Sequence, residues 1–177
     1  EEAAYAVAAL ERGEPPSPPP ASTQEESEAG LLPADADPAL LAEFLAECRD
    51  YIQSAEAALL SLETDPQDMG AVNTVFRAFH TVKGTSAFLG LSDIAGMAHR
   101  AESLLSRIRD GEIRCTGGYA DLALRSVDML KELLQAVQDA MGGEKVTPPE
   151  GLKNLMRLLD APDSAGITDE SDLMAEE

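Results

Sequence analysis

Four long segments of helical periodicity, separated by short breaks, constrain the fold of this chain more than any other feature. In each segment apolar residues recur every three or four positions, which is the pattern of an amphipathic helix. Asp37-Pro38 is typical of a helix start, because a capping side chain precedes a proline, and Gly111 is well placed as a C-terminal stop. The first segment runs from Asp37 to about Glu63, and the second follows the break at residues 64–66 and ends near Gly90. The third ends at Gly111, and the fourth lies between the glycine pairs at 117–118 and 142–143.

Four helices of roughly 20 residues joined by short loops bury their apolar faces most simply as an antiparallel up-and-down bundle. No alternating strand pattern competes with this arrangement. The sequence therefore predicts an all-α fold with a four-helix bundle over residues 37–143. A further apolar repeat within residues 144–161 predicts an additional short helix that caps or flanks the bundle.

The two ends of the chain differ in composition from this central region. Residues 1–12 could form a short helix, and the following residues up to 36 are proline-rich and acidic, which is typical of a linker. Residues 162–177 are predicted to form a second, acidic and flexible linker. Because the chain opens with Glu1 rather than Met and has a linker at each end, we expect a fragment of a longer protein.

The chain is strongly acidic, with 13 Lys and Arg residues, 33 Asp and Glu residues and a formal net charge of −20. Such a charge repels polyanions, so it argues against nucleic acid and anionic membranes as partners. No apolar stretch approaches the roughly 18 residues needed to cross a bilayer, and the first residues lack the basic start of a secretory signal. We therefore expect a soluble, cytoplasmic protein without membrane insertion.

The two cysteines, Cys48 and Cys115, fall in different segments and have no CxxC or metal-ligand spacing. They predict neither a disulfide framework nor a zinc site. Cys48 lies on an apolar helical stripe and is expected in the core.

His80 is the first candidate for chemistry, because it lies at the edge of the apolar stripe of the second helix. The stripe centres near Phe79, which places His80 about 100° away, on the shoulder of the buried face. Its imidazole should therefore reach solvent. Arg77, Gly84 and Ala87 share this shoulder, and the small residues there let the backbone of a partner protein approach closely.

Glu102 occupies the corresponding shoulder of the third helix. His80 and Glu102 lie about 15 and 18 Å from the turn around Gly90 along their helix axes. If these shoulders face each other rather than away, the two side chains lie side by side. A carboxylate that accepts the N–H of one imidazole nitrogen leaves the other nitrogen free as a nucleophile. Lys83, one turn after His80, can extend its ammonium toward the same surface and supply a positive charge there.

Each of these residues also has an ordinary structural interpretation. A lone helical histidine is usually a surface residue, Glu102 can belong to a solvated face, and Lys83 can simply cover the core with its stem. A metal site using His80 and His99 is conceivable, but no second carboxylate pair or Glu-x-x-His is aligned with them. We therefore predict no metal site.

A longer motif around His80 favours the functional interpretation. The run HTVKGTSAFLGL at residues 80–91, preceded by VFRAF at 75–79, resembles the phosphoacceptor motif of the histidine-phosphotransfer (HPt) domain of CheA-type chemotaxis sensor kinases. The run MAHRAESLL at residues 97–105, followed by RDGE at 109–112, resembles the third helix of that family with its His-x-x-Glu. The resemblance covers roughly residues 38–140.

This resemblance implies that His80 is phosphorylated, that Glu102 hydrogen-bonds its imidazole, and that Lys83 and His99 complete the active patch. It also implies two partners, the ATP-binding domain of a CheA-type kinase and a response regulator of the CheY class. ATP and its magnesium are expected on partner domains, because nothing in this chain resembles a P-loop or an ATP-lid motif. The chain is then the phosphoacceptor segment of a histidine kinase, without the catalytic kinase domain. A stand-alone carrier and a non-catalytic helical interaction domain are the alternatives.

Overall fold

The computed structural model of the chain describes residues 31–170. The expected short helix at residues 1–12, most of the expected N-terminal linker and residues 171–177 lie outside this range. The described elements are α2 (Pro38–Thr64), α3 (Met69–Phe88), α4 (Ser92–Arg109), α5 (Gly117–Met141), α6 (Leu152–Asp160) and the short 3-10 helix η1 (Asp163–Ala165).

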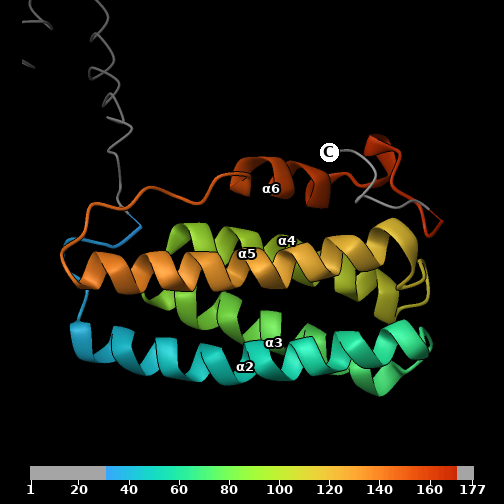
Figure 1. Cartoon of the computed structure of the whole chain (residues 1–177), viewed down its shortest axis with the longest axis horizontal. Helices are drawn as coiled ribbons and strands as arrows, with labels where there is room; N and C mark the ends of the chain where they lie inside the picture. The colour runs from blue at the N-terminus through green and yellow to red at the C-terminus, as the bar shows by residue number, and fades with distance from the viewer. Residues whose placement is uncertain (1–30, 171–177) are drawn as a thin grey trace, which may run out of the picture.

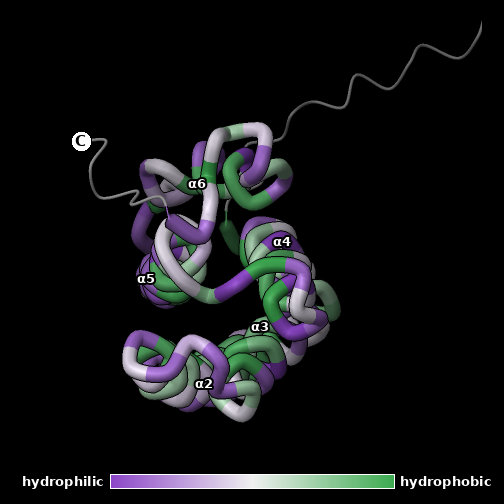
Figure 2. Tube along the Cα trace, turned by 90° about the vertical axis from the view of Figure 1, so that its right-hand side faces the viewer, coloured by the Kyte–Doolittle hydropathy of each residue, from purple (hydrophilic) through white to green (hydrophobic). Residues whose placement is uncertain are grey.

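Helices α2 to α5 form a bundle in which each helix packs against the next and α5 closes the ring against α2 (Figure 1). Figure 2 shows the bundle from its end, with α6 outside the ring and against α4 and α5. This arrangement confirms the predicted all-α four-helix bundle. The additional helix flanks the bundle, but it starts only at Leu152, because Pro148 and Pro149 exclude a regular helix before it.

Local sequence signals set the ends of the helices that position the candidate site. Asp37 accepts a hydrogen bond from the Ala39 amide at 2.8 Å, and Asp68 accepts one from the Ala71 amide at 3.0 Å, so both cap a helix start. Gly90 follows α3 with a φ of 74°, a left-handed conformation that glycine adopts without a steric penalty. The turn at residues 89–91 is therefore short, and α3 and α4 lie side by side and antiparallel.

The core lies between the inward faces of the four helices, as the apolar stripes predict. On α3, the side chains of Val72, Val75, Phe79 and Val82 are each at most 1% exposed. Burying each large apolar side chain stabilises the fold by about 1.5–3 kcal/mol. This burial fixes the rotation of α3 about its axis, and with it the direction in which His80 points. Cys48 is also buried, as expected.

The C-terminal segment at residues 162–170 differs from the flexible linker that the sequence predicts. Ile167 is only 3% exposed and belongs to the core. Asp163 accepts hydrogen bonds from the Tyr119 hydroxyl at 2.6 Å and from Arg107 Nη2 at 2.9 Å. A segment of linker-like composition is packed here because one large apolar side chain and several hydrogen bonds hold it on α4 and α5.

The end of the expected N-terminal linker is packed as well. Leu31 is 6% exposed and belongs to the core, and Pro33 lies close to Gly90 in the turn between α3 and α4. Residues 31–36 therefore belong to the folded unit rather than to a free linker.

Candidate functional site

His80 lies on the side of α3 that faces α4. Its side chain is 60% exposed, while the next residue toward the core, Phe79, is 1% exposed. The Nδ1 atom of His80 lies 2.9 Å from Oε1 of Glu102 on α4. The expected shoulder geometry is confirmed, since the two helices turn these side chains toward each other.

Glu102 connects His80 to a positive charge. Its side chain is 14% exposed, and its Oε2 lies 2.6 Å from Nζ of Lys83, one turn after His80 on α3. Within the described residues this buried oxygen has no hydrogen-bond partner besides that ammonium. The charge of Lys83 therefore offsets the hydration that the Glu102 carboxylate loses on burial.

The carboxyl of Glu102 is held in its ionised form. Burial raises the pKa of Glu102, but the hydrogen bonds from His80 and Lys83 and the Lys83 charge outweigh burial, and the pKa lies below its ordinary value of 4.5. An ionised carboxylate only accepts hydrogen bonds, so Nδ1 of His80 is the donor and carries the ring proton. In the neutral imidazole Nε2 then has a free lone pair on an exposed ring, which makes it a nitrogen nucleophile.

Two further residues extend this group, Phe76 next to His80 and Arg109 next to Phe76, and the sequence analysis assigned neither of them to the site. The ring of Phe76, one turn before His80 on α3, is stacked on the imidazole with centroids 6.0 Å apart and an interplanar angle of 18°. The guanidinium carbon of Arg109, from the end of α4, lies 4.3 Å from the centroid of the Phe76 ring. The i, i+4 spacing of Phe76 and His80 on a helix was the sequence signal for the first contact.

The predicted docking residues lie at the surface next to His80 along α3. Arg77, Gly84 and Ala87 are exposed, and a side chain added at Gly84 would meet no atom within 4 Å. The bare surface expected one turn beyond His80 is therefore present. A docking role for it stays a prediction.

His99 is exposed on α4, as the helical wheel indicates. Within residues 31–170 its side chain makes none of the hydrogen bonds, ion pairs or ring contacts that join His80, Glu102, Lys83 and Phe76. The structure joins the first three predicted site residues by hydrogen bonds and an ion pair, and within the described residues it gives the His99 side chain no such bond to them.

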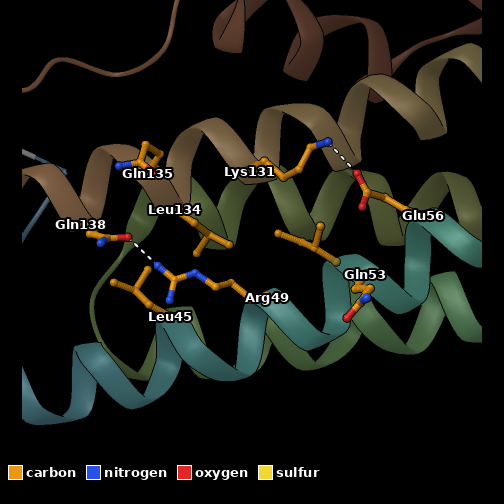
Figure 3. Close-up of a pocket in the computed structure, with 9 residues that line it drawn as sticks. Leu45, Arg49, Gln53, Glu56, Lys131, Leu134, Gln135 and Gln138 are labelled. Carbon is orange, nitrogen blue, oxygen red and sulfur yellow. Dashed lines mark hydrogen bonds and ion pairs between the residues drawn. The ribbon is translucent and has the colours of Figure 1, made fainter.

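A cleft of about 230 Å³ between α2 and α5 lies outside this group of residues. Figure 3 shows that pairs of the cleft's own side chains bridge the two helices, Arg49 with Gln138 and Lys131 with Glu56. The cleft contains no predicted site residue.

Neither the cysteines nor the possible metal ligands form a second site in the part of the chain that the structure describes. Burial raises the pKa of Cys48 to about 12 and that of Cys115 to about 11, so both thiols stay protonated at neutral pH. Among residues 31–170, no three His, Cys, Asp or Glu side chains are grouped to hold a metal ion. In the same range no helix has the length and apolar character that a membrane span requires.

Comparison with known proteins identifies the family. Residues 39–140, more than half of the chain, match the model of the Hpt domain, and the chain belongs to this family. The chain is 37% identical over 100 residues to the sensor histidine kinase CheAY of Helicobacter pylori and 35% identical over 102 residues to the chemotaxis protein CheA of Bacillus subtilis. These matches cover 56% and 58% of this chain but only 12% and 15% of those relatives.

The fold of the chain is also similar to solved structures of phosphotransfer domains. The CheA phosphotransferase domain from Thermotoga maritima is similar at a TM-score of 0.53 and 35% identity, and the match covers 55% of this chain and 92% of that domain. The phosphorylated P1 domain of CheA3 from R. sphaeroides, solved in complex with CheY6, is similar at a TM-score of 0.62 and 27% identity, covering 72% and 97% of the two chains.

Proposed function

We propose that this bundle is a phosphocarrier of a two-component, chemotaxis-like system and that Nε2 of His80 is the atom that takes up and passes on the phosphoryl group. The observation that carries the proposal is the hydrogen bond between His80 Nδ1 and Glu102 Oε1 at 2.9 Å. It leaves the other nitrogen of an exposed imidazole with its lone pair free. The match to CheA-type Hpt domains supports the same role.

Uptake is a displacement at phosphorus. The Nε2 lone pair of His80 forms the new N–P bond, the bond from phosphorus to the bridging oxygen of ATP breaks, and ADP leaves with that electron pair. The imidazole keeps its Nδ1 proton and gains positive charge, which the Glu102 carboxylate stabilises. In the second step an aspartate of the receiver attacks phosphorus, the N–P bond breaks, and its electrons return to Nε2.

Lys83 has two roles in this proposal. Its ammonium, 2.6 Å from Oε2, keeps Glu102 ionised and oriented toward His80. It also brings positive charge to the surface that receives an anionic phosphoryl group. His99, whose side chain makes no hydrogen bond or ion pair with these residues within the described range, is proposed only as an outer member of the patch, on the strength of the family resemblance.

The partners in the proposal are a CheA-type ATP-binding domain, which holds ATP and magnesium, and a response regulator of the CheY class. The relatives named CheA and the similar P1 domain solved with CheY6 support this choice. We place the reaction in the cytoplasm, where ATP is available. The bare surface at Gly84 and Ala87, with Arg77 at its edge, is the proposed docking face.

Phosphate labelling tests the proposal against a non-catalytic interaction domain. Incubation with a CheA-type kinase domain and radiolabelled ATP should give an acid-labile, base-stable label, and phosphoramidate should phosphorylate the chain without any partner. His80→Gln should abolish both reactions, while His99→Gln should lower the label only in part, because His99 is an outer member of the patch and does not carry the phosphoryl group. Labelling of the His80→Gln chain would remove His80 from the proposed role.

A further inference from the structure

The imidazole of His80 has one hydrogen bond and one aromatic neighbour, and together they determine its orientation. The bond to Glu102 fixes the position of Nδ1 but leaves the ring free to turn about that contact. The Phe76 ring, nearly parallel at 18° with its centroid 6.0 Å away, restricts this turning, because a rotated imidazole would lose the offset stacking on it. The direction of Nε2 thus depends on Phe76 as well as on Glu102.

The Phe76 ring is itself held from a second helix. Arg109 of α4 places its guanidinium carbon 4.3 Å from the ring centroid. The guanidinium is tied to its own helix end, because Nη2 donates to Ser106 Oγ at 3.2 Å and Nε donates to Asp110 Oδ1 at 3.2 Å. A planar guanidinium stacks on an aromatic face, whereas the compact ammonium of lysine does not.

Packing alone does not explain this arrangement. Phe76 is only partly buried, unlike Val75 and Phe79 beside it, so part of its ring is left for His80 and Arg109. The Arg109–Asp110 pair is solvent-accessible and contributes little to stability by itself. Arg109 contacts Phe76, and Phe76 contacts His80. Both contacts lie where α3 faces α4, as does the hydrogen bond of His80 to Glu102.

We propose that Phe76 and Arg109 are positioning residues that hold the imidazole plane of His80 so that Nε2 faces the incoming phosphoryl group. This inference rests on the proposed function of His80. Glu102 selects the tautomer, and the stack selects the ring orientation. Neither Phe76 nor Arg109 contacts the phosphoryl group in this role, so neither is a catalytic residue.

The test compares four variants of the full chain, Phe76→Leu, Phe76→Tyr, Arg109→Ala and Arg109→Lys. The control is Arg157→Ala, which removes an exposed arginine from the last turn of α6, as Arg109 lies in the last turn of α4. Rates of His80 phosphorylation by phosphoramidate are measured alongside NMR of the His80 ring. Phe76→Leu should slow uptake about two- to twelvefold, the range that corresponds to one aromatic pair.

The NMR readout separates positioning from fold stability. In Phe76→Leu and Arg109→Ala the ring-current shift of the His80 ring protons should fall, while the Nδ1–H tautomer set by Glu102 stays. Phe76→Tyr should keep both the rate and the shift, and Arg109→Lys should lie between wild type and Arg109→Ala, because an ammonium keeps the attraction to the ring but not the planar stack. Wild-type rates and shifts in Arg109→Ala and in a folded Phe76→Leu would overturn the inference.

The outcomes also distinguish this inference from the proposed function. A wild-type chain that shows the ring-current shift but takes no phosphoryl group from phosphoramidate or kinase refutes the function of His80 and leaves the stack intact. A wild-type chain that is phosphorylated but shows no shift refutes the stack alone. If Phe76→Leu fails to fold, Arg109→Ala decides the matter, because Arg109 lies outside the core.

Discussion

Replacing Glu102 by Gln should slow phosphorylation of His80 while the bundle stays folded. Gln keeps the shape of Glu but carries no charge and has one oxygen and one NH₂ group. The carboxylate meets two donors, His80 Nδ1 at 2.9 Å and Lys83 Nζ at 2.6 Å. The amide can accept from only one of them, because its NH₂ then faces the other donor.

The size of the effect follows from the charge that is lost. A charge-assisted hydrogen bond is stronger than a neutral one by about 1–2 kcal/mol. This difference acts on the transition state, because the imidazole becomes positive as Nε2 bonds to phosphorus. The uptake rate should therefore fall about five- to thirtyfold. The free energy of unfolding should fall by at most about 2 kcal/mol.

This prediction is tested by the initial rates of labelling with phosphoramidate and with a CheA-type kinase. Glu132→Gln is the matched control, because it makes the same replacement at an exposed position on α5. Nitrogen NMR of His80 should show that the Nδ1–H tautomer loses population in Glu102→Gln but not in the control. Equal rates in both variants would refute the role of the carboxylate.

The lowered pKa of Glu102 also fixes the sign of a pH effect. The folded chain favours the carboxylate, so this group stabilises the fold above the ordinary pKa of 4.5, and the contribution is lost as the pH falls through the lower, folded-state pKa. The stability difference between wild type and Glu102→Gln should be present at neutral pH and shrink in acid. Urea unfolding at both pH values tests this, and a constant difference would contradict it.

Three other predictions concern the rest of the fold. Gly117→Ala should destabilise the chain by more than the about 1–2 kcal/mol of left-handed strain and expose the C-terminal segment to proteolysis, since φ is 52° there and a Cβ would also clash with the Asp169 carbonyl oxygen. The thiols of Cys48 and Cys115 should react with a thiol reagent only after unfolding, because burial raises the pKa of both. Gly84→Leu should keep the fold and uptake from phosphoramidate but slow transfer to a receiver, because only the docking face changes.

The helices and the His80–Glu102 pair could be predicted because they depend on periodicity and register. The apolar stripe of α3 fixes which way His80 points, and the short turn around Gly90 fixes its level against Glu102 on α4. The position of Lys83 could be predicted in the same way, because it lies one turn after His80 on the same helix. These relations require only the geometry of a regular helix.

The parts that the sequence did not predict depend on side-chain conformation and on weak patterns. The contact of Arg109 with Phe76 requires particular rotamers at a helix end, which periodicity does not encode. The packing of residues 162–170 depends on Ile167 and on hydrogen bonds to Asp163, within a run whose composition is that of a linker. His99 came from the family resemblance alone, and within residues 31–170 its side chain forms no hydrogen bond or ion pair with the other site residues.

The identity of the phosphorylated atom is the most direct test of the proposed role of His80. Phosphorus and nitrogen NMR of the phosphorylated chain should find a single N–P bond at Nε2 of His80, with the Nδ1 proton still hydrogen-bonded to Glu102. Phosphate on Nδ1, or on any residue other than His80, would contradict the proposed tautomer and the site built on it.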